Sequence, residues 1–539
     1  MGSFANPLIC ASFCARKRNL FYFFLPSPFS LKISQQTHSP RKILIFPLNP
    51  KTGSSTMVKA AIAIYNRTII FFLLLFKSGR FNPDLFPGKG MFLSGCLFPF
   101  FFLLASCEKQ TTPVTLPNPQ LTLTIEDVAV TEAWLRLGAQ ETAAEQQIVI
   151  WRDSSEIYNL GGAIADTTLY DSVLLPAHDY TYRAELHKDG QKIVDTEPVN
   201  ITTMDTTSHN FQWEIFEFGG VHGSSVLYDV AIVNENDIWA VGEIHTAETD
   251  TFDSLGNWIP AYNAMHWNGS EWELKRVNFY LCPNGTSPTP YPIKAVYAFS
   301  SDNIWFTRGG SIVHWDGSEF IHDCQINSVI DGSINEIWGT DSNGLYAVGY
   351  AGTIVYYTGQ FWSPLISGTE VDLRDITGVS ADKVWASGYT SSFNESILLE
   401  FDGRDWQVKK LSKPGNPPDP YIDGTIANIW ASQRFLYVIS GIGVLRESIK
   451  TGARRLYHWQ EIGLPIGFSY GAYGTGDNNL FVVGEFGTIL HFNGISWQKY
   501  LFFNLTNGPR LLSVNSSENL VVVVGLSNGG RAIIFRGAQ

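Results

Sequence analysis

The sequence lacks the short motifs that mark many enzymes, metal sites and nucleotide sites. It contains no Walker loop, no dinucleotide fingerprint and no H-E-x-x-H pair. None of its six cysteines forms a C-x-x-C pair, which excludes a zinc ribbon and a thioredoxin-type centre. Helical patterns are missing as well, and charged residues make up only 16% of the chain while aromatic residues reach 14%. This composition favours many short strands joined by tight turns.

Basic residues are concentrated near the N-terminus. Residues 1–106 hold 12 of the 37 Lys and Arg residues but a single acid, Asp84, so the remainder has a formal net charge of −24. A body this acidic is soluble and repels phosphate backbones. The sequence therefore predicts no nucleic-acid partner.

An apolar run ends at Cys107. It is shorter than the roughly 20 residues that a membrane span needs, but it fits the hydrophobic region of a signal peptide at residues 91–106. The run closes with Leu104-Ala-Ser-Cys107, which resembles the lipobox of bacterial lipoproteins. The resemblance implies that Cys107 is acylated and anchors an exported protein to a membrane.

The segment after Cys107 is polar. Residues 107–119 are rich in Pro, Thr and Gln, which predicts an extended tether. The residue after the cysteine is Glu108, not the Asp that retains enterobacterial lipoproteins in the inner membrane. By that resemblance, we expect an outer-membrane lipoprotein on the cell surface or the periplasmic side.

Residues 1–90 do not resemble a mature domain. They are basic and rich in Phe and Pro, and we interpret them as a mis-assigned or disordered extension. The true start would be Met57, Met91 or a non-Met codon near residues 77–89. A membrane segment near residues 60–76 is the alternative, although Asn66 and Arg67 are unfavourable in a bilayer core.

Residues 120–204 show the alternation of apolar and polar residues that is typical of strands, beginning with Leu121, Leu123 and Ile125. Leu174-Leu-Pro-Ala-His-Asp-Tyr180 resembles the tyrosine corner of fibronectin type III domains. The resemblance implies a small β-sandwich in which the Tyr180 hydroxyl bonds back to the chain. Trp134 is expected in its core.

Residues 211–539 repeat a unit of about 40 residues, which predicts a propeller. A clear copy runs from Asn479-Leu-Phe481 through Gly484 and His491 to Trp497. Seven copies predict seven blades of four strands each. The aromatic or valine anchors fall at 239, 305, 346, 385, 437, 481 and 521.

Two of the spacings between successive anchors are longer than the others, and the last repeat lacks its outer strand. Insertions fall at about 244–262 and 412–424 and are candidate contact surfaces or merely tolerated excursions. The last copy stops before its outer strand. Phe211–Phe218 has the required form, so we expect it to supply that strand and close the ring, which removes an open sheet edge.

The Gly-x-x-Trp turns of these repeats resemble degenerate Asp-box (BNR-like) repeats, as in sialidase-type and photosystem II assembly-factor propellers. Only Asp316-Gly317 and Asp402-Gly403 keep the acid of that motif. The resemblance therefore implies the all-β fold and not an activity.

No residue pattern marks a catalytic, metal or cofactor site. His266, His314 and His491 occupy equivalent repeat positions in three blades, and they are too far apart around a ring to converge on one ion. No three of the propeller's arginines are marked as partners, and a carboxylate pair is not excluded. Cys282 and Cys324 either pair or remain free thiols.

The favoured function is a non-catalytic binding or assembly scaffold at the cell envelope. It would be held to the membrane through Cys107 and would bind a protein or glycan partner at the propeller faces. The alternative is a glycan-active hydrolase of the sialidase-like propeller type. We expect no cofactor and no metal, and no ligand-binding residue is identifiable from the sequence.

Overall fold

The structure, a computed structural model, describes residues 118–539 apart from 165, 281–286, 331, 417–418, 423, 466–468 and 504–506. The predicted signal peptide, Cys107 and most of the predicted tether lie outside the described residues. Residues 113–539 form one compact unit. Nearer the N-terminus only the backbone of four strands is described, β1 (Phe23–Phe24), β2 (Ser30–Leu31), β3 (Val58–Tyr65) and β4 (Thr68–Leu75).

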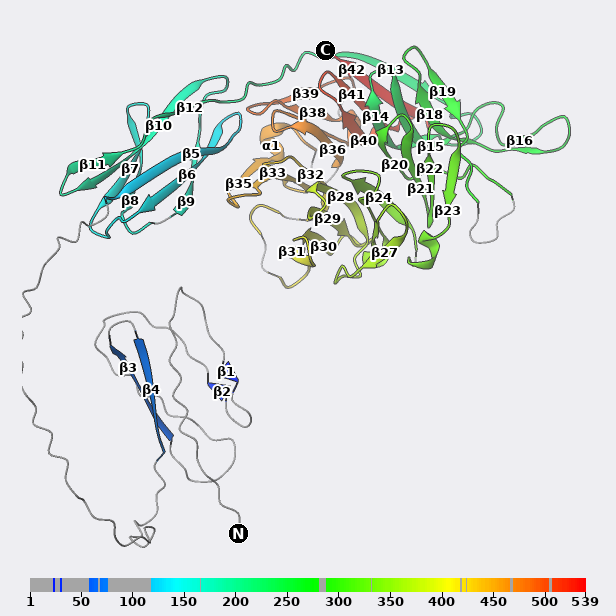
Figure 1. Cartoon of the computed structure of the whole chain (residues 1–539). Helices are drawn as coiled ribbons and strands as arrows, with labels where there is room; N and C mark the ends of the chain where they lie inside the picture. The colour runs from blue at the N-terminus through cyan, green and yellow to red at the C-terminus, as the bar shows by residue number, and fades with distance from the viewer. Residues whose placement is uncertain are drawn as a thin grey trace, which may run out of the picture. The chain divides into compact units, whose positions relative to one another are not determined.

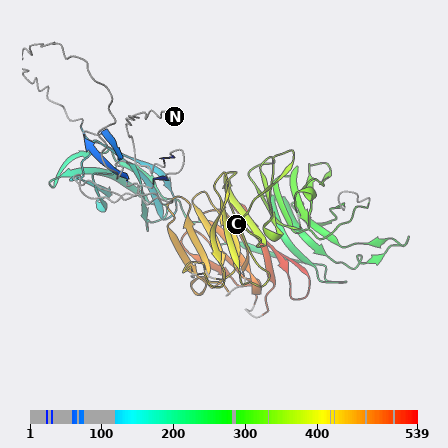
Figure 2. The same ribbon diagram turned by 90° about the horizontal axis from the view of Figure 1, so that it is seen from below.

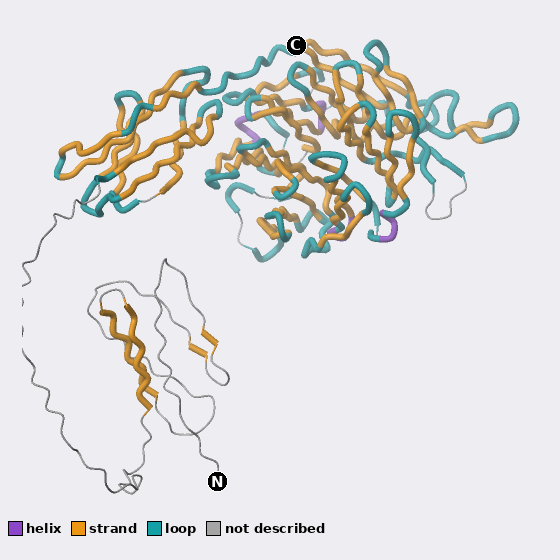
Figure 3. The backbone as a smooth tube through the Cα atoms, in the orientation of Figure 1, coloured by secondary structure: helices purple, strands orange, loops and turns teal. Residues whose placement is uncertain are grey.

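Strands make up nearly all regular structure of the compact unit, which confirms the all-β prediction (Figure 3). The helical elements among the described residues are all a single turn: η2 (Ile326–Ser328), η3 (Tyr350–Gly352), α1 (Trp459–Ile462) and η4 (Glu485–Gly487). No helix in the described part is long and apolar enough to cross a membrane.

The first part of the unit is a β-sandwich of two sheets. One sheet has the order β5-β6-β9, and in the other β10 pairs with β7, β11 and β12, while β8 pairs with β7. The strands are β5 (Gln120–Val128), β6 (Glu132–Gln140), β7 (Gln147–Arg152), β8 (Ser155–Gly161), β9 (Asp166–Ser172), β10 (Asp179–Lys188), β11 (Gln191–Asp195) and β12 (Val199–Thr202).

Alternating side chains from the two sheets form the sandwich core. Leu135, Ile150 and Tyr182 are fully buried there. Tyr180 lies at the edge of this core, and its hydroxyl accepts the Leu175 N–H at 2.8 Å. The hydroxyl thus bonds back to the chain, as the tyrosine-corner resemblance implied.

Seven four-stranded antiparallel sheets follow within the described residues, and they form the blades of a propeller (Figure 1). Blades 1 to 3 are β14 (Val226–Asn234), β15 (Asp237–Ile244), β18 (Tyr262–Trp267), β19 (Trp272–Lys275); β20 (Ala295–Ser300), β21 (Asn303–Arg308), β22 (Ser311–Trp315), β23 (Phe320–Asp323); and β24 (Ile334–Gly339), β25 (Leu345–Gly349), β26 (Ile354–Tyr357), β27 (Trp362–Leu365). A hairpin, β16 (Thr251–Phe252) and β17 (Trp258–Ile259), is inserted in blade 1.

Blades 4 to 6 repeat the same order from the inner to the outer strand. They are β28 (Leu373–Ser380), β29 (Lys383–Tyr389), β30 (Ser396–Phe401), β31 (Trp406–Ser412); β32 (Ile426–Ala431), β33 (Phe435–Ser440), β34 (Gly443–Ser448), β35 (Arg454–His458); and β36 (Ser469–Gly476), β37 (Asn479–Gly484), β38 (Ile489–Phe492), β39 (Trp497–Tyr500).

The seventh blade joins the two ends of the propeller sequence. It contains β40 (Arg510–Ser516), β41 (Leu520–Leu526) and β42 (Ala532–Ala538), and its outer strand is β13 (Gln212–Phe218). The antiparallel register runs from Gln212 opposite Ala538 to Phe218 opposite Ala532. The inner strands then contact one another around the ring, with β40 against β14. The predicted closing strand is therefore in place.

The repeated residues have structural roles. The rings of His266, His314 and His491 stack on the anchors Trp239, Trp305 and Phe481 with centroids 4.6, 4.3 and 4.4 Å apart. Each histidine also bonds the Asp or Asn two residues before its anchor. In the seventh blade the register places Val522, not Val521, at the anchor position, because one more residue precedes Gly525 there.

The sandwich packs against strands and turns of blades 5 and 6. Glu132 and Arg446 form an ion pair in which both side chains are buried, and Trp134 packs on Phe435 with ring centroids 5.7 Å apart. Arg434 bridges Asp127 of the sandwich and Asp477 of blade 6 at 2.9 and 3.0 Å. Trp134 is thus a core residue of the contact between the sandwich and blades 5 and 6, and not of the sandwich core in which it was expected.

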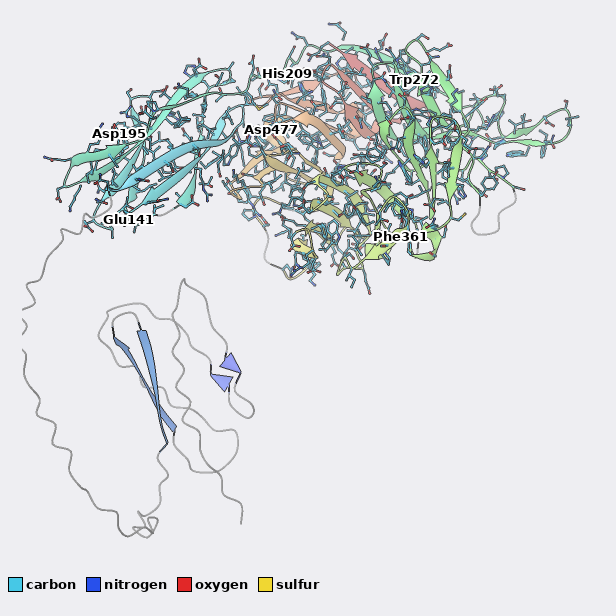
Figure 4. All side chains as sticks on the ribbon, viewed as in Figure 1. Glu141, Asp195, His209, Trp272, Phe361 and Asp477 are labelled. Atoms are coloured by element: carbon cyan, nitrogen blue, oxygen red, sulfur yellow. The ribbon has the colours of Figure 1, made fainter. Side chains whose placement is uncertain are left out.

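The linker between the sandwich and β13 is held by two histidines. His209 Nδ1 lies 2.8 Å from Nδ1 of the buried His491 (Figure 4 labels His209). Burial lowers the pKa of both rings, and the neighbouring His209 lowers that of His491 further, to about 3. The pair is therefore built for two neutral imidazoles, one donating to the other.

The first prediction concerns ring closure. Phe211, at the entry to β13, packs on Phe481 with ring centroids 5.4 Å apart and is 8% exposed. We expect Phe211→Ala to lower the free energy of unfolding by about 3 kcal/mol in urea titrations, because it leaves a cavity between blades 6 and 7, where the closing strand enters. Ile215→Ala, on the exposed side of β13, should cost less than about 1 kcal/mol. Equal losses in both variants would contradict the role of Phe211.

The second prediction is a pH dependence. Because the folded state lowers the pKa of His209 and His491, their contribution to stability is present above about pH 6.5 and is lost as the pH falls toward 3. Between pH 7 and pH 5, thermal unfolding should show wild type losing about 1 kcal/mol more than His491→Phe, which stacks on Phe481 but does not titrate. Parallel pH profiles would refute this.

Candidate functional site

The up-and-down order of the blades defines two faces. The entry face carries the connections from each outer strand to the next inner strand and from each second strand to its third. Both predicted insertions, 244–262 and 412–424, lie in such connections. The exit face carries the other turns, including the tight turns before the outer strands.

A channel with a cavity volume of about 1040 Å³ runs between the inner strands of all seven blades. Near its entry-face end, the inner strand of six blades skips one residue in its pairing with the second strand, which is a β-bulge. The bulge turns the skipped residue toward the entry-face mouth of the channel.

We call the seven residues at this place the mouth residues. They are the skipped residues of six blades and, in blade 2, the residue just before β20, and all of them line the cavity. Together they are Tyr228, Lys294, Asn335, Arg374, Ala427, Tyr470 and Leu512.

Lys294 is the cation of this mouth that has no acidic partner. Its Nζ lies 3.8 Å from the centroid of the Tyr228 ring, and within the described residues it forms no ion pair. Enclosure by the mouth, together with the positive charge of Arg374, lowers the pKa of Lys294. An anion placed beside Lys294 would relieve both effects.

The other cations of the mouth are held by aromatic rings and acids. Arg374 lies over Tyr389 at 4.3 Å and is 3.6 Å from Asp372. Arg510 lies near Tyr470 at 5.9 Å and binds Glu485 at 2.7 Å. These guanidinium groups are positioned in advance, so they can bind an acidic group with little loss of side-chain entropy.

Three carboxyl groups lie directly below the mouth residues. Asp229, Glu336 and Asp375 follow Tyr228, Asn335 and Arg374 in sequence and line the same cavity. Burial raises the pKa of Asp229 to about 6 and that of Asp375 to about 7. Burial and the negative charges of the other two raise the pKa of Glu336 as well.

Two of these carboxyl groups tie neighbouring blades together. Asp229 of blade 1 accepts the Val296 N–H of blade 2 at 2.8 Å and the Ser513 hydroxyl of blade 7 at 2.6 Å. Asp375 of blade 4 accepts the Ile429 N–H of blade 5 at 2.6 Å. Their partners explain them as structural groups of the ring rather than as an acid–base pair.

The exit-face mouth is partly covered. Met204, which follows the sandwich, lines the cavity there beside Ser432 and Arg434. Arg434 is 3.6 Å from the Met204 sulfur and is tied to Asp127 of the sandwich. The sandwich therefore contacts the exit face, and the mouth on the entry face is the one open to a partner.

Exposed apolar side chains surround the mouth on the entry face. Half of the large apolar residues with high exposure lie in its connections, while the rest are on the sandwich, outer strands or exit turns. Exposed large apolar side chains that gather on one face of a protein are typical of a surface that docks another protein. The exposed apolar residues in the entry-face connections are Val221, Phe252, Leu255, Trp258, Tyr280, Tyr350, Ile366, Phe393 and Leu501.

The structure does not bring the histidine trio together. His266, His314 and His491 lie on the third strands of blades 1, 2 and 6. Among the described residues, no three His, Cys, Asp or Glu side chains form a group that could hold a metal ion. Sequence reasoning missed the mouth residues, since they match no motif and are found only by aligning the inner strands at the bulge.

One catalytic pattern in the chain is a coincidence of sequence. Gly525-Leu-Ser-Asn-Gly529 matches G-x-S-x-G, which in hydrolases places a serine between a strand and a helix. Here it connects β41 to β42, and the Ser527 hydroxyl accepts the Arg531 N–H at 3.2 Å. The serine caps a turn between two strands.

The cysteines are partly described. Cys324 is disulfide-bonded. Cys282, the partner considered for it, lies outside the described residues, as does Cys107. A disulfide is typical of a protein that folds in an oxidising compartment.

Comparisons with known proteins find similarity among solved structures. No family model matches the chain, and no curated protein matches it. Among solved structures, "YCF48 bound to D1 peptide" aligns with a TM-score of 0.43 and 15% identity over 62% of this chain and 99% of that chain. The propeller fold therefore rests on the strand pairing of this chain itself.

A third prediction tests the channel carboxyls. Glu336 Oε1 accepts the Ile337 N–H at 3.0 Å, and a glutamine keeps this bond without a charge. Since the folded state raises the pKa of Glu336, its contribution to stability is present at low pH and is lost as the pH rises above 4.5. We expect Glu336→Gln to match wild type at pH 5 and to melt higher at pH 8.

The matched control is Glu271→Gln, which removes an exposed acid from the exit face of blade 1. It should melt like wild type at both pH values. A Glu336→Gln variant that shifted the melting temperature equally at pH 5 and pH 8 would show that Glu336 is ionised in the folded protein.

Proposed function

We propose that this protein is an exported binding protein, anchored to a membrane through Cys107, whose entry face docks a partner protein and takes an acidic segment of that partner into the channel mouth. The observation that carries this proposal is Lys294, a cation without an acidic partner among the described residues, in an open mouth flanked by Arg374 and Arg510.

The apolar residues of the entry face support a protein as the partner. Phe393 is 66% exposed, and its ring stacks on the ring of Tyr389. The guanidinium group of Arg374 lies over the same Tyr389 ring. Aromatic residues and arginine are enriched in protein interfaces, so this grouping favours a protein over a small ion as the partner.

The position of the sandwich leaves the entry-face mouth free. The sandwich contacts the exit side of the propeller through Arg434 and Arg446. The entry face is therefore the face that the sandwich does not cover. The disulfide at Cys324 is compatible with export.

Hydrolysis of a glycan is less well supported. Of the arginines that line the cavity, Arg374 and Arg510 are already paired with acids and Arg434 lies at the other mouth. The channel carboxyls Asp229 and Asp375 hold backbone N–H groups of neighbouring blades. Binding of a partner would leave these ion pairs and hydrogen bonds intact. Catalysis by the same arginines and carboxyls would require them to break.

The fourth prediction tests the mouth with a hexaglutamate peptide. Calorimetry should show binding to residues 113–539, and Lys294→Gln should weaken it about tenfold, because a charge-assisted bond contributes about 1.5 kcal/mol. Arg404→Gln, an exposed cation in an exit-face turn, should leave affinity unchanged. Equal effects of both substitutions, or turnover of glycosides by the wild type, would contradict the proposal.

A further inference from the structure

The blade 1 insertion forms an arm with an apolar tip. We define the arm as residues 248–260, which contain the hairpin β16–β17 and extend away from the ring in Figures 1 and 2. Phe252, Leu255 and Trp258 are 65, 84 and 52% exposed, and the rings of Phe252 and Trp258 are in edge contact with each other at 5.2 Å. The hairpin is ordered by its own hydrogen bonds, yet it leaves its apolar side chains in solvent.

The arm is also acidic. Its charged residues are Glu248, Asp250 and Asp253, and it contains no Lys, Arg or His. Asp250 is paired with His245 at 2.7 Å. Asp253 caps the tip of the hairpin by accepting the Leu255 and Asn257 N–H groups, each at 2.8 Å, and it forms no ion pair within the described residues.

Bonds from Asn257 hold the pKa of Asp253 below its ordinary range, so the tip carries a negative charge at any physiological pH. The tip therefore combines one unpaired carboxylate with three exposed apolar side chains. This combination calls for an occupant that offers a cation among aromatic or apolar side chains.

The mouth of the same protein offers that chemistry. Lys294 has no acidic partner among the described residues and lies over the Tyr228 ring, and Tyr470 and Leu512 line the same mouth. The arm and the mouth with Lys294 both lie on the entry face of the propeller. We propose that the arm of one molecule occupies the mouth of a second copy of this chain, with Asp253 beside Lys294, and that the second copy does the same in return.

A contact between the same face of two copies is reciprocal. Such a contact closes after two molecules and gives a symmetric dimer instead of an open fibre. The inference rests on the proposed function, because the arm is then one acidic segment that the mouth accepts. Dimerisation would cover the apolar tip and would compete with any external partner for the same mouth.

The fifth prediction uses charge reversal on residues 113–539, which form one compact unit. Sedimentation velocity should show a concentration-dependent dimer for the wild type. Asp253→Lys and Lys294→Glu should each weaken dimerisation at least about tenfold, because each places like charges together. Glu271→Lys makes the same change of charge on the exit face of blade 1 and should dimerise like wild type.

Mixing the two monomeric variants is the decisive measurement. In the mixed dimer, the lysine introduced into one arm would face the glutamate introduced into the other mouth, while the second contact would keep the native Asp253 and Lys294. Both contacts become attractive, so the dimer should return. The variant that carries both substitutions should dimerise by itself for the same reason. A wild type that stays monomeric, or a mixture that stays monomeric, would overturn the inference.

The outcome separates the inference from the proposed function. If hexaglutamate binds the mouth and the wild type is a monomer, the arm is not the occupant while the binding site stands. If the dimer forms and follows the charge reversals but hexaglutamate does not bind, the mouth accepts its own arm and not acidic segments in general. With both correct, hexaglutamate should shift the dimer toward monomer.

Discussion

Pairing between β13 and β42 is the contact on which the propeller depends. Each blade packs its apolar faces on two neighbours, so an open ring would leave the first and last blades with one face in water and β42 with an unpaired edge. The register from Gln212–Ala538 to Phe218–Ala532 closes both gaps at once. Phe211 and the His209–His491 contact fix the approach of this strand.

Closure also determines which surface is available for binding. Because the closing strand comes directly after the sandwich, the linker brings the sandwich onto the turns of blades 5 and 6, where Glu132 meets Arg446. A buried ion pair of this kind resists separation, since either charge alone would be left without a partner. One mouth of the channel is thus partly covered, and the mouth with Lys294 faces solvent.

The fold was largely predictable, and the candidate site was not. Repeated anchors, glycine turns and the missing last strand are local patterns, so they revealed the blades and Phe211–Phe218 as the closing segment. The anchor of blade 7 was the one anchor placed wrongly, because one additional residue before Gly525 moves it from Val521 to Val522. Lys294 belongs to no motif, and its role appears only when the inner strands bring it into a mouth shared by seven blades.

The sequence by itself determined the all-β class, the repeat and the strand that closes it, because hydrophobic period and turn chemistry act over a few residues. Only the tertiary structure decided that His266, His314 and His491 are stacked on their anchors, that Trp134 packs on Phe435, and that Lys294 has no acidic partner among the described residues. These properties depend on side chains from distant segments, whose meeting is set by ring closure and not by local preference.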